Sequence, residues 1–255
     1  MSDDELLALL LAAADAVAAA LADTADRGLV AGSASQHRSD LATDAAALAV
    51  LRRGGVSVLS EESGLTRGRL PLTVVLDPLD GSTNAAQGIP WYATSLCAVD
   101  SLGLRAAVVR NLAGGECYTA VRGGGAACDG VPLAPSQCTE VGEAVIGISG
   151  MPPASLGWRQ FRAFGAAALD LCAVAAGRLD AYVDCSVDAH GPWDYLGGVL
   201  VCLEAGAVVA DASARPLAAL DHGARRTPVA AATEPLLAEL LERRAAAFLT
   251  AGAPR

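Results

Sequence analysis

The sequence predicts an α+β fold in which a large, mostly antiparallel sheet is followed by a half where helices and strands alternate. Three observations predict it. The 255 residues are 53% hydrophobic and 18% charged, so the chain can bury a core without disulfides or structural metal. Short apolar runs separated by turn residues fill positions 56–128, which is typical of an antiparallel meander. Beyond residue 157, segments of helix length and strand length take turns.

Local signals place the elements of the first half. Ser2 and Glu5 match a capping box, which starts a helix rich in Ala and Leu. Because Pro78 has no N–H for a central ladder, we expect the strand before it to end at Asp77. Helices are expected from residue 2 to about residue 23 and over 40–51, and strands over 56–59, 72–76, 92–99, 104–110, 116–121 and 126–128.

A stretch rich in Pro, Gly and Ser over 149–157 predicts a boundary. We therefore expect an N-terminal half over 1–148, with the large sheet, and a C-terminal α/β half over 149–255. In the second half, helices are expected over 166–176, 193–204 and 234–248, and strands over 181–184 and 207–210.

Charge and cysteine content exclude several function classes. There are 28 acidic and 18 basic residues, and the net charge of −10 disfavours binding to nucleic acid or an anionic membrane. A phosphate substrate would need a local positive charge, for which a divalent cation is the simplest source. The seven cysteines are odd in number and form no CxxC pair, which favours a reducing cytoplasm. The N-terminus is acidic, unlike a signal peptide, and no uncharged apolar run is long enough to predict a membrane span.

Acidic residues recur where strands are expected to end or helices to begin. Taken singly, each fits a solvated turn or a helix start. Two carboxylates ~5 Å apart repel by roughly 3 kcal/mol at an effective dielectric constant of ~20, so a shared pocket would need cations or protons. Carboxylate oxygens suit Mg²⁺, and the absence of Cys and His from these motifs argues against zinc. The motifs are Glu61-Glu62, DPLDGSTN over 77–84, Gly191-Pro192-Trp193-Asp194, and Asp44.

In order and spacing, these motifs and the stretch over 165–182 resemble the inositol monophosphatase family of Mg²⁺-dependent, lithium-sensitive phosphatases. The resemblance covers about residues 40–211. It implies a layered α-β-α-β-α sandwich, a cytoplasmic homodimer, two or three Mg²⁺ ions and a small phosphorylated substrate. Inositol 1-phosphate is the first candidate; fructose 1,6-bisphosphate, histidinol phosphate and 3′-phosphoadenosine 5′-phosphate are the others. A homologue that binds ligand without turnover is the alternative from another class.

The resemblance also implies residue roles by position. Metal ligands would be Glu61, Asp77, the backbone carbonyl of Leu79, Asp80 and Asp194, with Asp77 bridging two ions. Asp44 and Ser82 would orient the attacking water, and no side chain would act as nucleophile. Contacts to phosphate or substrate would come from Gly81, Ser82, Gly165, Ala166, Ala167, Asp184 and His190. The loop over 185–192 is longer than in typical inositol monophosphatases and is expected to border the leaving-group pocket.

Overall fold

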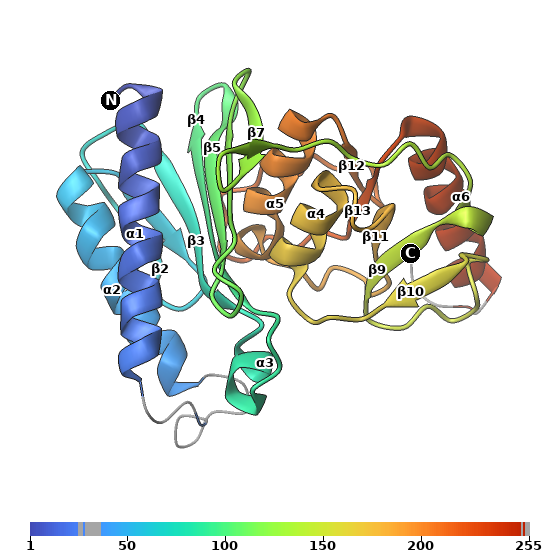
Figure 1. Ribbon diagram of the computed structural model, residues 1–255, viewed down its shortest axis with the longest axis horizontal. Helices are drawn as coiled ribbons and strands as arrows, with labels where there is room; N and C mark the ends of the chain where they lie inside the picture. The colour runs from blue at the N-terminus through green and yellow to red at the C-terminus, as the bar shows by residue number, and fades with distance from the viewer. Residues whose placement is uncertain (25–27, 29–36, 251, 253–255) are drawn as a thin grey trace.

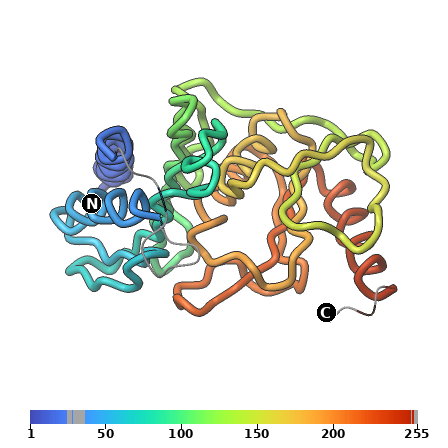
Figure 2. Tube along the Cα trace, turned by 90° about the horizontal axis from the view of Figure 1, so that it is seen from below, coloured from blue at the N-terminus to red at the C-terminus, as the bar shows by residue number. Residues whose placement is uncertain are grey.

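The computed structural model describes residues 1–24, 28, 37–250 and 252. Three layers of helices alternate with two sheets along the long axis of the molecule (Figure 1). Seen after a 90° turn, the chain still runs from the blue N-terminal helices on one side to the red C-terminal helix on the other (Figure 2). The α-β-α-β-α sandwich is therefore confirmed. Its helical layers are α1 (Asp3–Asp23) with α2 (Arg38–Gly54), then α4 (Ala167–Ala175) with α5 (Pro192–Ala205), and last α6 (Glu234–Thr250).

The larger sheet has eight strands in the order β2-β1-β3-β4-β5-β6-β7-β8. Every pair is antiparallel except β1 with β3. The predicted meander is confirmed, while β2 and β8 were not predicted because they have only three and two residues. The strands are β1 (Ser57–Ser60), β2 (Gly64–Thr66), β3 (Thr73–Asp80), β4 (Ala93–Asp100), β5 (Gly103–Asn111), β6 (Cys117–Val121), β7 (Gly125–Cys128) and β8 (Val131–Pro132).

Strand β3 continues past the point where we expected it to end. Its pairing with β4 is irregular between Asp77 and Asp80, and it resumes at Asp80 opposite Ala93. The missing N–H of Pro78 is therefore absorbed by the irregularity, and the prediction of an end at Asp77 was wrong. A short helix, α3 (Ser82–Gln87), follows directly.

The smaller sheet has five strands in the order β10-β9-β11-β13-β12. Strands β9, β10 and β13 were not predicted, because each is short and pairs with segments distant in the chain. The predicted boundary between residues 148 and 149 lies inside β9, so the second sheet begins before it. The strands are β9 (Val145–Ser149), β10 (Gln160–Arg162), β11 (Ala181–Asp184), β12 (Val208–Asp211) and β13 (Pro228–Ala231).

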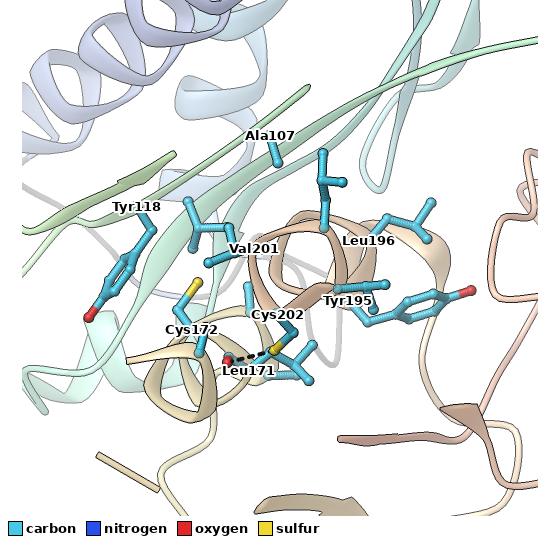
Figure 3. Packing of buried hydrophobic residues seen from close by; sticks show 14 of the residues in the cluster. Ala107, Tyr118, Leu171, Cys172, Tyr195, Leu196, Val201 and Cys202 are labelled. Carbon is cyan, nitrogen blue, oxygen red and sulfur yellow. Dashed lines mark hydrogen bonds between the residues drawn. The ribbon is translucent and has the colours of Figure 1, made fainter. Parts of the chain in front are cut away.

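Helices α4 and α5 fill the space between the sheets. All nine residues of α4 are buried, and Tyr118 from β6 packs in the same cluster (Figure 3). The thiol of Cys202 on α5 donates a hydrogen bond of 3.0 Å to the Leu171 carbonyl on α4 (Figure 3). All seven cysteines are free thiols. Close packing of two helices therefore joins the N-terminal and C-terminal sheets into one core.

Gly198 allows this close helix packing, and replacing it should destabilise the protein. A Cβ atom at this position would lie 2.6 Å from Leu171 Cβ and 3.0 Å from the Ala168 carbonyl oxygen. We expect Gly198→Ala to lower the free energy of unfolding by about 1–3 kcal/mol, because a packed core must shift to admit the methyl group. Gly142→Ala is the control, since nothing lies within 4 Å of its added Cβ. Urea denaturation measures both; equal stability of the two variants would contradict the packing.

Helix α1 meets the length and composition of a membrane span, although no span was predicted. Here the helix packs its buried residues, among them Leu6, Leu10 and Val17, on α2 and the larger sheet. The predicted capping box is confirmed, because the Glu5 N–H donates to Ser2 Oγ and the Ser2 N–H donates to Glu5 Oε2. In this setting α1 is the outer layer of the sandwich.

Candidate metal centre

The parallel pairing of β1 and β3 brings the first two acidic motifs together. Ser60 is the register partner of Leu76, and the Glu61 N–H donates to the Leu76 carbonyl at 3.1 Å. Glu61 therefore leaves β1 beside Asp77 on β3. The carboxyl ends of parallel strands meet at one edge of a sheet, so both acids face the same edge.

The third motif arrives at the start of α5. Asp194 lies in the first turn of this helix, where its Oδ2 accepts a hydrogen bond of 2.7 Å from the Gly191 N–H. Carboxylate oxygens of Glu61, Asp77 and Asp194 lie within 4.8 Å of one another. The predicted meeting of acids from three distant segments is confirmed. We call these three residues the acidic triad.

Asp80 connects the triad to the central helices. Its Oδ2 accepts a hydrogen bond of 2.8 Å from the Ala168 N–H, in the first turn of α4. The Leu79 N–H donates to Asp77 Oδ1 at 2.9 Å, which orients the Asp77 carboxylate. The DPLDGSTN motif thereby touches both sheet and helix layers at the metal centre.

The electrostatics are those of several acids gathered beside one histidine, since among the described residues only the His190 ring pairs with them, at Asp194. Burial, followed by the charge of Glu61, raises the pKa of Asp77 well above its usual range. Burial and the charge of Asp194 raise the pKa of Asp80 in the same way. Loss of solvent, then the charges of Asp194 and Glu62, raise the pKa of Glu61 to about 8. A divalent cation would relieve this repulsion, and the donors are the hard oxygens that Mg²⁺ prefers.

Asp44 lies behind the triad on α2 and is buried. Its Oδ1 accepts a hydrogen bond of 2.5 Å from Ser60 Oγ, the last residue of β1. Among the described residues, no hydrogen bond joins Asp44 to Ser82, its expected partner. Ser82 is instead the first residue of α3, after Gly81 with its left-handed φ of +86°. Ser60 was not predicted, because only the fold brings β1 against α2.

A cavity of about 150 Å³ adjoins the triad on the side of the C-terminal half. The predicted residues Gly165, Ala166, Ala167 and His190 line it, whereas Asp184 is not among its lining residues and is fully buried. The His190 ring lines the cavity and also contacts Asp184, with His190 Nε2 3.7 Å from Asp184 Oδ2. The complete lining is Asp80, Ile148, Ser149, Gly165, Ala166, Ala167, Asp170, Tyr182, His190 and Asp194.

His190 lies in the long loop over 185–192 and contacts two neighbouring polar side chains. Its Nδ1 lies 3.3 Å from Asp194 Oδ2, and its Nε2 lies 3.2 Å from the Tyr182 hydroxyl. It was predicted as a substrate contact, with an exposed loop position as the alternative; the ring is largely buried. Trp193 is buried and packs on His222, whose Nε2 lies 3.0 Å from the Glu61 carbonyl oxygen.

Comparison with known proteins agrees with this fold. The profile of the inositol monophosphatase family matches residues 3–247. A Pasteurella multocida protein named Nus factor SuhB is 33% identical over 190 residues, which cover 68% of this chain and 70% of that protein. An Archaeoglobus fulgidus protein named fructose-1,6-bisphosphatase/inositol-1-monophosphatase is 34% identical over 209 residues, which cover 80% and 81%. The solved structure of an inositol monophosphatase from Anabaena superposes with a TM-score of 0.79 at 25% identity, covering 96% of each chain.

Proposed function

This chain belongs to the inositol monophosphatase family, and on that premise we propose that it is a Mg²⁺-dependent phosphatase acting on a small phosphomonoester. Inositol 1-phosphate is the first candidate substrate, supported by the name of the Archaeoglobus fulgidus relative. One observation carries the proposal: oxygens of Glu61, Asp77 and Asp194 lie within 4.8 Å of one another beside a cavity of about 150 Å³. This cavity is smaller than the roughly 300–1,000 Å³ of pockets that hold drug-sized ligands, so it has room only for a small group.

The donor set fits Mg²⁺, because it consists of hard carboxylate oxygens from separate segments, more of them than the single neighbouring His190 ring can balance. The family resemblance assigns Glu61, Asp77 and the Leu79 carbonyl to one ion, and Asp77, Asp80 and Asp194 to a second. When bound, Mg²⁺ supplies charge neutralisation at the phosphoryl group and lowers the pKa of a coordinated water. A third ion and inhibition by lithium belong to the same proposal.

The chain's own residues position the reactants. Asp44, held by Ser60, would accept a proton from the attacking water and orient it, and the Ser82 hydroxyl would assist from α3. The backbone N–H groups of Gly81 and Ser82 would donate to the phosphate. Positioning and preorganised hydrogen bonds of this kind account for most of the acceleration in phosphoryl transfer.

Ser60 should matter for the rate rather than for substrate affinity. Its hydroxyl donates to Asp44 and accepts from the Glu62 N–H at 3.2 Å, so it fixes Asp44 relative to the turn that holds Glu61. We expect Ser60→Ala to lower kcat about tenfold with KM changed less than twofold, because a misplaced base costs about 1.4 kcal/mol in the barrier. Steady-state phosphate release measures both constants.

Ser57→Ala is the matched control for this prediction. Ser57 lies on the same strand, and its Oγ accepts from the Gly68 N–H, away from the acidic triad. It should retain the kcat of the unaltered protein. If both serine variants lose activity equally, the effect belongs to the strand and not to the hydrogen bond with Asp44.

A bisphosphate substrate is less well supported by the cavity. Among the described residues that line it, none is Lys or Arg, so a second phosphate would find no positive partner there. Two arginines, Arg162 and Arg178, line a separate cavity of about 260 Å³. Arg178 already pairs with Glu116 at 2.6 Å. The candidate bisphosphates are therefore second to a monophosphate.

A regulatory role is the alternative from another class, and it is favoured by the relative named Nus factor SuhB. Every residue assigned above to metal or water is present in this chain, which favours turnover over binding alone.

The deciding experiment measures phosphate release from purified protein with Mg²⁺, with EDTA, and with Mg²⁺ plus lithium. The substrates are inositol 1-phosphate, fructose 1,6-bisphosphate, histidinol phosphate and 3′-phosphoadenosine 5′-phosphate. We expect Mg²⁺-dependent release that is fastest for inositol 1-phosphate and is inhibited by lithium. Release from none of the four with Mg²⁺ would overturn the proposed function.

A further inference from the structure

Asp170 lines the cavity, and none of the roles predicted from the sequence was assigned to it. It lies in the first turn of α4 and is 1% exposed. Its Oδ1 accepts a hydrogen bond of 2.9 Å from the indole Nε1–H of Trp91. Trp91 in turn packs against Phe164, with ring centroids 4.7 Å apart. The carboxyl group is thus held in one orientation by an aromatic pair from outside its own helix.

One oxygen of this carboxyl is not accounted for by protein contacts. Among the described residues, the Trp91 indole is the only side chain that hydrogen-bonds Asp170. This oxygen is not one of the fully buried, unpartnered side-chain atoms of the described residues, which are His37 Nδ1 and Asp184 Oδ2, so it keeps contact with the solvent of the cavity. Because Asp170 lines the cavity, a ligand in that cavity can supply the missing hydrogen bond.

Two other polar side chains of the cavity wall are already engaged with each other. The Tyr182 hydroxyl and the His190 ring lie 3.2 Å apart, and His190 also contacts Asp194. Asp184, whose family position recognises substrate hydroxyls, is fully buried behind the His190 ring. Asp80 and Asp194 belong to the metal centre. Asp170 is therefore the carboxyl group best placed to meet the leaving group.

The state of this carboxyl group suits a hydroxyl partner. Burial raises the pKa of Asp170 to about 8, so the group carries a proton over much of the neutral range. A protonated carboxyl both donates and accepts hydrogen bonds, as an alcohol does. A second phosphate would meet no Lys or Arg among the described lining residues.

We propose that Asp170, positioned by Trp91, recognises a hydroxyl group of the leaving group and selects small uncharged polyol phosphates. The assignment rests on the proposed phosphatase function and names the substrate class for it. Asp170 contacts the substrate, whereas Trp91 acts through Asp170 as a positioning residue.

The test compares an ester with hydroxyl groups, inositol 1-phosphate, with one whose leaving group has none, p-nitrophenyl phosphate. We expect Asp170→Ala to lower kcat/KM for inositol 1-phosphate by about tenfold or more, mainly through KM, because removal of the carboxyl group leaves the substrate hydroxyl without a partner. The loss for p-nitrophenyl phosphate should be several-fold smaller. Trp91→Phe keeps the aromatic packing, loses the N–H donor and should shift selectivity in the same direction by about threefold.

Asp180→Ala is the matched control. Asp180 is hydrogen-bonded by the Ser136 hydroxyl and the Val145 N–H and does not line the cavity. It should preserve the ratio of kcat/KM values for the two esters. Equal losses on both esters in Asp170→Ala, or an unchanged KM for inositol 1-phosphate, would overturn the assignment.

Binding of inositol 1-phosphate by calorimetry, with Ca²⁺ in place of Mg²⁺, separates this assignment from the proposed function. An unaltered protein that hydrolyses neither of these esters nor the other candidate substrates would overturn the phosphatase proposal alone. The role of Asp170 would then be decided by affinity: binding weakened about tenfold in Asp170→Ala supports it, and equal affinity overturns it. If Asp170→Ala fails to fold, the selectivity shift of Trp91→Phe decides.

Discussion

Replacing Asp194 with asparagine should lower kcat for Mg²⁺-dependent phosphate release by about a thousandfold or more, with the protein still folded. Asparagine keeps the shape of the side chain and can still accept from the Gly191 N–H, but it removes one negative charge from the acidic triad. A thousandfold loss corresponds to about 4 kcal/mol of transition-state stabilisation, within the range expected for impaired metal catalysis. The Asp194 side chain is 20% exposed, so the loss of folding stability should be small.

The control for this variant is Asp129→Asn. Asp129 lies outside the cavity and the triad, and its positive φ of 49° is one that asparagine also tolerates. Phosphate release and circular dichroism on both variants separate a lost metal ligand from a lost fold. Near-normal turnover by folded Asp194→Asn would refute the assignment of Asp194 to the metal centre.

The parts of the fold that depend on residues close together in the chain could be predicted from the sequence. The capping box of Ser2 and Glu5 starts α1 as expected, and the turn residues of the meander separate β4 to β7. Strand β13 escaped prediction because four buried residues carry no alternation, and its pairing with β11 joins Ala231 to Ala181, far apart in the chain.

In the candidate site too, features carried by a local motif could be predicted, and contacts between distant residues could not. The acidic triad could be expected because each acid sits in a recognisable local motif. Its supporting contacts could not, since Ser60 reaches Asp44 across 16 residues and Trp91 reaches Asp170 across 79. The contact of His190 with the buried Asp184 depends on the conformation of the long loop, for which the residue order holds no signal.

The metal-free protein should lose stability as the pH rises, and Mg²⁺ should restore it. Glu61 has a pKa of about 8 in the folded protein against an ordinary value of 4.5, and Asp40 about 6 against 3.8. For Glu61 and Asp40 burial is the first cause, and for Asp77 it is burial followed by Glu61. A carboxyl group with a raised folded pKa contributes its full stability below the unfolded value, near pH 4, and loses it as the pH rises through the folded value. The window therefore runs from about pH 4 to about pH 8.

Mg²⁺ bound at the acidic triad would displace the protons of Glu61 and Asp77, so its stabilising effect should grow across the same window. At about 100 times the dissociation constant, a ligand stabilises the folded state by about 2.7 kcal/mol, which corresponds to a rise in Tm of roughly 5–10 °C for a chain of this size. We expect that rise near pH 8 and about 2 °C or less near pH 5, where protons compete for the same oxygens. Thermal denaturation with EDTA or Mg²⁺ at several pH values measures it.

General screening of the net charge of −10 would also stabilise the protein at high pH, so NaCl at equal ionic strength is the necessary comparison. Screening acts on all surface carboxylates, whereas binding at the triad requires the charge of Asp194. The Mg²⁺-dependent rise in Tm should therefore shrink in Asp194→Asn and persist in Asp129→Asn. A rise that NaCl reproduces, or that is the same at pH 5 and pH 8, would mean that the clustered acids do not share a cation.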